Sequence, residues 1–155
     1  TNSMDNNLPF FAEPGNISIE TTLKHFFSDA KITGSKNHDL WMEFKKINTR
    51  FNDENLALIE KRLKNELKPN ATTTDSIEKA YKSLLTRKYR YTAHFAATNG
   101  NKEIAPYLAL SEIADINTTY LDTIQKSLTP EVAKSKYGKM LNEHIKERKT
   151  LEVQK

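Results

Sequence analysis

From Lys36 onward, apolar residues recur every three or four positions, and this spacing restricts most of the chain to α-helices that each bury one face. The first stripe has steps of four, three and four: Leu40, Phe44, Ile47 and Phe51. A second stripe continues it: Leu56, Ile59, Leu63 and Leu67. Asn52 and Asp53, between the two stripes, indicate a kink or a break, and Pro69 ends the run.

Four further helices are predicted after Pro69. Asp75 and Glu78 have the spacing of a capping box, and Asn99 and Gly100 end that helix in the manner of a left-handed cap. The remaining apolar stripes outline three more helices, within residues 104–113, 120–128 and 130–149. The connections are short, so neighbouring helices should run antiparallel.

The beginning of the chain has a different pattern, with short β-prone runs separated by turns. Residues 8–12 and 17–21 are the first two runs, and residues 13–16 (Glu-Pro-Gly-Asn) have turn composition. We therefore expect a hairpin or a tight strand connection, with Pro9 at an edge or at the first position of its strand because proline cannot donate to a ladder. A third run covers residues 30–33.

These patterns predict a mainly α fold, with about five helices in an antiparallel bundle-like array and a small N-terminal β-hairpin or strand remnant. The expected division is a β remnant over residues 1–35 and a helical domain over residues 36–155, in one compact unit. Hydrophobic residues make up only 37% of the chain, which fits slim helices that each bury one stripe. No window approaches the roughly 18 apolar residues that span a bilayer.

Charge and cysteine content exclude some classes of site. The formal net charge of +4 is spread along the chain, which favours solubility over a surface that follows a phosphate backbone. Cysteine is absent, so internal disulfides and thiolate metal sites are excluded.

No residues have the spacing of a catalytic, cofactor-binding or metal site, so we predict none. The four histidines are far apart and outside any HExxH spacing: His25, His38, His94 and His144. The carboxylates that come closest to an acid–base pair have no partner histidine, and they are typical of a solvated helix face: Glu43, Asp53, Glu54 and Glu60. Ser111 and Ser135 lack the glycines of a nucleophile elbow, and Gly15 and Gly34 turn the backbone without forming a phosphate loop.

Two patterns suggest macromolecular binding. Residues 86–91 (Thr-Arg-Lys-Tyr-Arg-Tyr) interleave cations with aromatic rings, as surfaces for single-stranded nucleic acid do. On a helix they spread around the circumference, which favours Tyr91 and Phe95 in the core, and we predict no nucleic-acid partner. An aromatic set lies in the first third of the chain: Phe10, Phe11, Phe26, Phe27, Trp41, Phe44 and Phe51. We expect most of it in a core between the first strands and the first helix, and any exposed part to mark a docking surface.

Both ends of the chain resemble one known family. Residues 8–19 (Leu-Pro-Phe-Phe-Ala-Glu-Pro-Gly-Asn-Ile-Ser-Ile) and 30–35 resemble the last strands of a domain of unknown function at the front of bacterial TlpA/ResA-like thiol-disulfide oxidoreductases. Three later segments are similar to the helical connector before the thioredoxin-like domain of those proteins: residues 106–110, 127–138 and 145–153.

The resemblance implies an extracytoplasmic setting, in the periplasm or envelope, with any membrane or lipid anchor outside this chain. The family's earlier strands would precede Leu8, and its CxxC-bearing domain would follow Lys155. Gln154 stands where the family usually has glycine. No catalytic residue carries over, because the motif that holds the catalytic residues is not in this sequence.

We therefore expect a non-catalytic accessory module, without a cofactor, that spaces, docks or dimerises a thioredoxin-like domain. The alternative is a stand-alone helical protein that binds a peptide or another protein. Unpaired strand edges at the beginning of the chain also predict a homo-oligomer.

Overall fold

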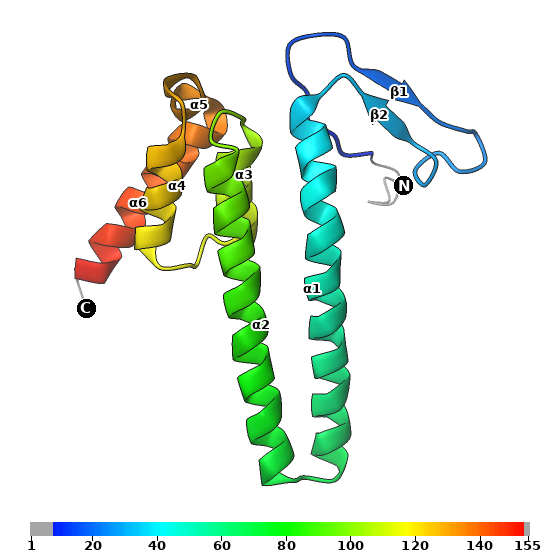
Figure 1. The fold of residues 1–155 in the computed structure, drawn as a ribbon, viewed down its shortest axis with the longest axis vertical. Helices are drawn as coiled ribbons and strands as arrows, with labels where there is room; N and C mark the ends of the chain where they lie inside the picture. Colours follow the sequence, from blue (N-terminus) through cyan, green and yellow to red (C-terminus); the bar gives the residue numbers. More distant parts are fainter. Residues whose placement is uncertain (1–7, 154–155) are drawn as a thin grey trace, which may run out of the picture. The chain divides into compact units, whose positions relative to one another are not determined.

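The computed structural model describes residues 8–153 and is mostly helical, with six helices and a small two-stranded antiparallel sheet (Figure 1). The predicted fold class is confirmed. The chain divides into two compact units, Thr1–Glu43 and Phe44–Lys155, which are described in turn. None of the helices in the described part combines the length and the apolar character that crossing a membrane requires.

The first unit contains two three-residue strands, β1 (Ser18–Glu20) and β2 (Lys31–Thr33), paired antiparallel with Ile19 opposite Ile32. Gly34 follows β2 with a φ of +94°, and a Cβ at this position would collide with the carbonyl group of Asn16. Glycine is therefore required where the chain turns from the sheet into α1 (Lys36–Leu67).

The predicted hairpin between residues 8–12 and 17–21 is wrong. β1 pairs with the third β-prone run, and residues 8–12 form no strand. Pro9 removes one ladder donor from this segment, and the segment lies instead against the beginning of α1.

Two contacts attach the first residues of the described chain to α1. The ring of Phe11 lies edge-on to that of Trp41, with centroids 5.8 Å apart. The carboxylate of Glu13 accepts hydrogen bonds from the backbone N–H groups of Lys36 at 2.7 Å and of Asn37 at 3.2 Å. Glu13 thus bonds N–H groups that a helix leaves without an internal partner in its first turn.

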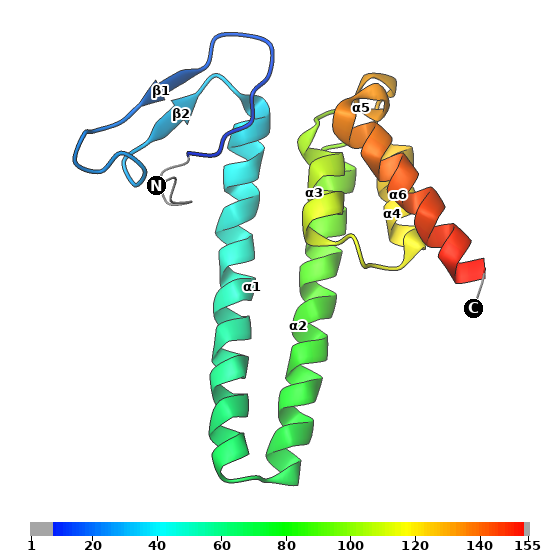
Figure 2. The ribbon, with the colours of Figure 1, turned by 180° about the vertical axis from the view of Figure 1, so that it is seen from behind.

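In the second unit, α2 (Ala71–Thr98) and the part of α1 that follows Glu43 form a long helical hairpin (Figures 1 and 2). Asn70 caps α2 by accepting a hydrogen bond from the Thr73 N–H at 3.2 Å. The break expected at Asn52 and Asp53 is absent. Both side chains are exposed, and asparagine and aspartate are only modestly less favourable than alanine inside a helix. The helix therefore continues through both positions.

Four shorter helices follow α2: α3 (Ile104–Glu112), α4 (Thr118–Ser127), α5 (Pro130–Lys134) and α6 (Lys136–Val153). Both α3 and α4 pack on α2, α6 packs on α3 and α4, and α5 packs on α6. The predicted fifth helix is in fact α5 and α6. Ser135 between them is extended, with a ψ of 171°, and its Oγ accepts a hydrogen bond from the Gly138 N–H at 3.3 Å. Ser135 therefore ends α5 and caps the beginning of α6.

The main core joins α2, α3, α4 and α6 rather than the sheet and α1. Leu121, Ile124 and Leu141 are fully buried in it. Small residues form an alanine seam in this cluster: Ala93 and Ala96 on α2 with Ala105 and Ala109 on α3. Methyl groups let helix axes approach closely.

The expectation that most of the aromatic set is core is only partly met. Phe44 is buried and Phe51 half-buried, and both contact Tyr91 of α2. In the first unit, Phe11 and Trp41 are half-buried, whereas three rings are exposed: Phe10, Phe26 and Phe27.

Candidate functional site

Within the described part of the second unit, no third helix packs on the end of the α1–α2 hairpin near residues 68–70 (Figures 1 and 2). Farther along the hairpin, α3 packs on α2 and ends at Glu112. There the Glu112 carboxylate accepts a hydrogen bond from Asn48 of α1 at 3.4 Å and forms an ion pair with Lys88 of α2 at 3.2 Å. Glu112, the last residue of α3, thus contacts both hairpin helices.

Between Glu112 and the end of the hairpin lies an open groove of about 400 Å³, here called the hairpin groove. Its walls come from both helices: Asn55, Leu58, Ile59, Arg62, Asn65 and Glu66 of α1, and Thr74, Ile77, Glu78 and Tyr81 of α2. Leu58 is buried beneath the groove surface, whereas Ile59 and Tyr81 are about half exposed. Apolar side chains with a polar rim are typical of a binding site.

Exposed leucines extend the groove around α1. Leu56 and Leu63 each expose 57% of their surface, and Leu67 exposes 83%. They share a helix face with Ile59 because they are spaced by three or four residues. This contiguous apolar surface has no cover within the described part of the second unit, which is the mark of an interaction surface.

Three contacts fix the register of α1 against α2. Asn65 donates a hydrogen bond to Thr74 at 2.8 Å, and Arg87 donates one to Glu54 at 2.5 Å. The rings of Phe51 and Tyr91 lie 6.0 Å apart. In this register Ile59 lies level with Tyr81, at the middle of the groove. The hydrogen bond to Glu54 raises the pKa of Arg87, so this guanidinium stays charged.

Several polar groups at the groove have no partner in the described residues. The side-chain oxygen of Asn55 is buried and accepts no hydrogen bond. Glu78 and Lys82, one turn apart on α2, form no ion pair in the part of the chain that the structure describes. A buried oxygen without a donor is unfavourable for stability.

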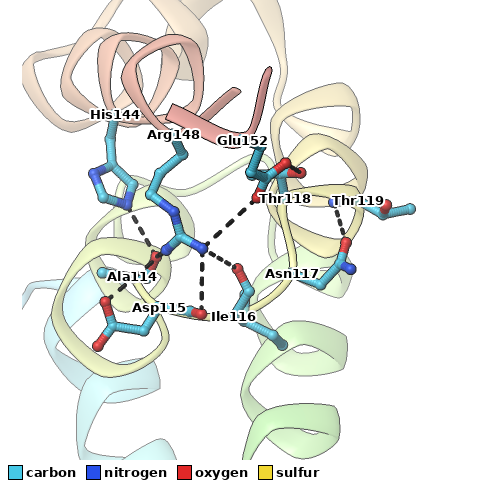
Figure 3. Close-up of polar contacts among 9 residues, drawn as sticks. All are labelled: Ala114, Asp115, Ile116, Asn117, Thr118, Thr119, His144, Arg148 and Glu152. Carbon is cyan, nitrogen blue, oxygen red and sulfur yellow. Dashed lines mark hydrogen bonds and ion pairs between the residues drawn. The ribbon is translucent and has the colours of Figure 1, made fainter. Parts of the chain in front are cut away.

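A second polar cluster, drawn in Figure 3, has a structural role. Arg148 of α6 donates to the backbone carbonyl of Ala114 at 2.7 Å and to that of Ile116 at 3.5 Å. The ring Nε2 of His144 lies 3.0 Å from the same Ala114 oxygen. These carbonyls belong to the connection between α3 and α4, outside both helices, so α6 holds the α3–α4 connection in place.

The four histidines remain separate. His144 belongs to the cluster in Figure 3, and His38 is buried with its ring 5.6 Å from that of Trp41. His25 and His94 are exposed. Within residues 8–153, no three side chains of metal-ligating type gather at one place.

The other residues singled out from the sequence serve the fold or face solvent. Glu54 binds Arg87, and Ser135 caps α6. Four of them are exposed: Glu43, Asp53, Glu60 and Ser111. Gly15 has a φ of +136° and Gly34 one of +94°, as expected for residues that turn the backbone.

The basic and aromatic segment, residues 86–91, is largely occupied by contacts within the chain. Arg87 pairs with Glu54, and Lys88 pairs with Glu112. Tyr91 stacks on Phe44 at 5.8 Å. Two of the three cations thus face carboxylates, which disfavours a nucleic-acid surface here.

The hairpin groove was missed in the sequence because Leu56, Ile59, Leu63 and Leu67 were assigned to the buried face of the first helix. The buried face continues instead through Phe51 and Leu58. The signal in the sequence was a second apolar stripe on the same helix. Each residue turns the helix by about 100°, so the second stripe lies on another side of α1 than the buried stripe. Two stripes on one helix indicate two partners.

The comparisons with known proteins concern the beginning of the chain. Residues 1–41 match a family described as a domain of unknown function (DUF4369). No curated protein and no solved structure matches the chain. This match supports the coarser part of the resemblance, that the first residues are similar to a domain of unknown function.

Proposed function

We propose that this protein is a non-catalytic accessory module that works beside a thioredoxin-like domain of a TlpA/ResA-like system, and that the hairpin groove is its interaction surface. The uncovered groove, with exposed leucines beside it, is the observation that supports an interaction role. The thioredoxin-like partner rests on the resemblance at both ends of the chain, together with the family match over residues 1–41.

The residues of the chain support a role without redox turnover. Thiol–disulfide exchange needs a thiolate to attack a disulfide sulfur, and this sequence has no cysteine. The chain would therefore position a redox domain, in an extracytoplasmic setting, without entering the reaction itself.

An insulin-reduction assay tests this proposal. The chain alone should give no turnover above buffer with dithiothreitol as reductant, whereas a CxxC-bearing thioredoxin-like domain of the same family should be active in the same assay. Turnover by the chain alone would refute the non-catalytic role.

A binding measurement tests the partner. The isotope-labelled chain should show nuclear magnetic resonance shifts when that thioredoxin-like domain is added, and a thioredoxin from an unrelated family serves as the control. No shift with the first, or equal shifts with both, would contradict the accessory role.

The second candidate function is a stand-alone helical protein that binds a peptide or helix in the hairpin groove. The groove supports it directly, because apolar grooves between two helices are typical receptors for a third. The reading frame of the gene distinguishes the two functions. Continuation from Lys155 into a CxxC domain favours the accessory module, and a stop codon favours the stand-alone protein.

A further inference from the structure

We propose that a second copy of this chain occupies the hairpin groove, packed antiparallel across a two-fold axis at the level of Ile59 and Tyr81. The proposal names the partner at the groove and rests on the proposed function only in treating the groove as an interaction surface. Self-association needs no thioredoxin-like domain, so it can be measured on the chain alone.

The apolar centre of the groove is suited to this symmetry. With the axis at Tyr81, α2 of one copy lies over α2 of the other in the opposite direction, and α1 lies over α1. Leu85 and Ile77 lie four residues after and four residues before Tyr81, so Leu85 of one copy would face Ile77 of the other. Ile59 and Tyr81 would meet their own symmetry mates at the centre.

The charges on α2 are complementary in the same register. Glu78 lines the groove, and Lys82 is exposed one turn farther along α2. Reversing the direction of the second helix places Lys82 of one copy beside Glu78 of the other. Exposed ion pairs contribute little affinity, but they select a register and a direction.

The extent of the uncovered surface also suits a helical hairpin. From Asn48, which contacts the end of α3, to the end of α1 at Leu67 the helix is roughly 30 Å long. Two such hairpins form a four-helix bundle of ordinary size. Glu112 marks where the end of the second hairpin would meet α3.

Disulfide trapping is the sharpest test, because the natural chain has no cysteine. A residue on the two-fold axis lies next to its own symmetry mate, so Tyr81→Cys should form a disulfide-linked dimer on mild oxidation. Ser83→Cys is the matched control. It is exposed on the opposite side of the same helix and should stay monomeric on a denaturing gel.

Light scattering of the natural chain provides a second measurement that needs no oxidation. We expect a dimer at about 100 μM, a concentration at which a micromolar dissociation constant gives mostly dimer. Ile59→Glu should weaken the dimer at least tenfold with an unchanged circular dichroism spectrum. Leu151→Glu, which alters an exposed leucine of α6 outside the groove, should leave it intact.

A charge swap tests the register. Glu78→Lys should weaken the dimer severalfold at low salt, and the double variant Glu78→Lys with Lys82→Glu should restore it. A monomer at every concentration overturns the proposal, as does equal trapping of the Tyr81 and Ser83 variants. A monomer whose groove resonances shift with a thioredoxin-like domain or a helical peptide would assign the groove to that partner, and the accessory role would survive.

Discussion

Gly138 of α6 lies directly against the backbone carbonyl oxygen of Val132 in α5, and a Cβ on Gly138 would fall far inside the contact distance to that oxygen. The carbonyl of Ala133 closes the same space. Only glycine lets α5 and α6 come this close at the Ser135 turn, since its Cα carries no side chain.

Gly138→Ala should therefore destabilise the fold. Alanine favours a helix over glycine, but the collision is with backbone and cannot be relieved by a rotamer change. We expect the free energy of unfolding to fall by about 1–3 kcal/mol, measured by urea denaturation. Lys139→Ala, at the exposed next position, is the control. An unchanged or increased stability of the Gly138 variant would contradict the close packing.

Arg148→Ala should weaken the attachment of α6 to the α3–α4 connection. The substitution leaves the Ala114 and Ile116 carbonyls without their charged donor, which costs about 1–3 kcal/mol in the free energy of unfolding. Lys146→Ala removes an exposed cation from the same helix and should change stability by less than about 0.5 kcal/mol. Equal effects of the two variants in urea denaturation would show that Arg148 acts only through its charge.

Glu13→Ala should release the beginning of α1. Losing the side-chain acceptor for the Lys36 and Asn37 N–H groups should cost about 1 kcal/mol locally, as at other helix caps. Hydrogen exchange at these two amides should then be roughly fivefold faster. Glu20→Ala, at the exposed end of β1, is the control and should leave both amides unchanged. Slow exchange in the Glu13 variant would argue against the cap.

Leu121→Ala and Leu63→Ala should differ greatly in stability at low protein concentration. Leu121 is fully buried in the main core, so its truncation should cost about 2–5 kcal/mol. Leu63 exposes 57% of its surface, and its truncation should cost less than about 0.5 kcal/mol in the monomer. Thermal unfolding of both variants checks this. A large loss at Leu63 would mean that the stripe on α1 is covered within one chain.

Helix positions were predictable where the sequence carries local stop and start signals. Pro69 and Pro130 were correctly placed at the end of α1 and the beginning of α5. Proline acts through its own backbone, because its ring fixes φ and removes the N–H donor. Gly100 does follow α2, but the predicted left-handed cap is wrong, because neither Asn99 nor Gly100 has a positive φ. The start predicted at Asp75 is also wrong, because α2 begins at Ala71 and is capped by Asn70. The break at Ser135 was missed because the apolar stripe continues across it, and only the cap on α6 shows that two helices share the stripe.

Strand pairing and the groove depended on contacts that the sequence does not display. The first two of the three β-prone runs were expected to pair because they are neighbours in the sequence. Residues 8–12 lie against α1 instead, where Phe11 contacts Trp41 and the adjacent Glu13 caps the helix. Similarly, Leu63 has the spacing of a core residue, and only the position of α2 shows that it lies outside the core. Periodicity identifies an apolar face without saying which partner covers it.

The alanine seam has an evolutionary consequence. Because Ala96 and Ala105 are fully buried in the core that joins α2 and α3, a bulkier side chain at either position would force its neighbours apart. Sequence drift at these positions should therefore be joint, with a gain of volume on one helix matched by a loss on the other. In orthologous genes, the seam should stand out as a small set of covarying codons on an otherwise tolerant helical surface.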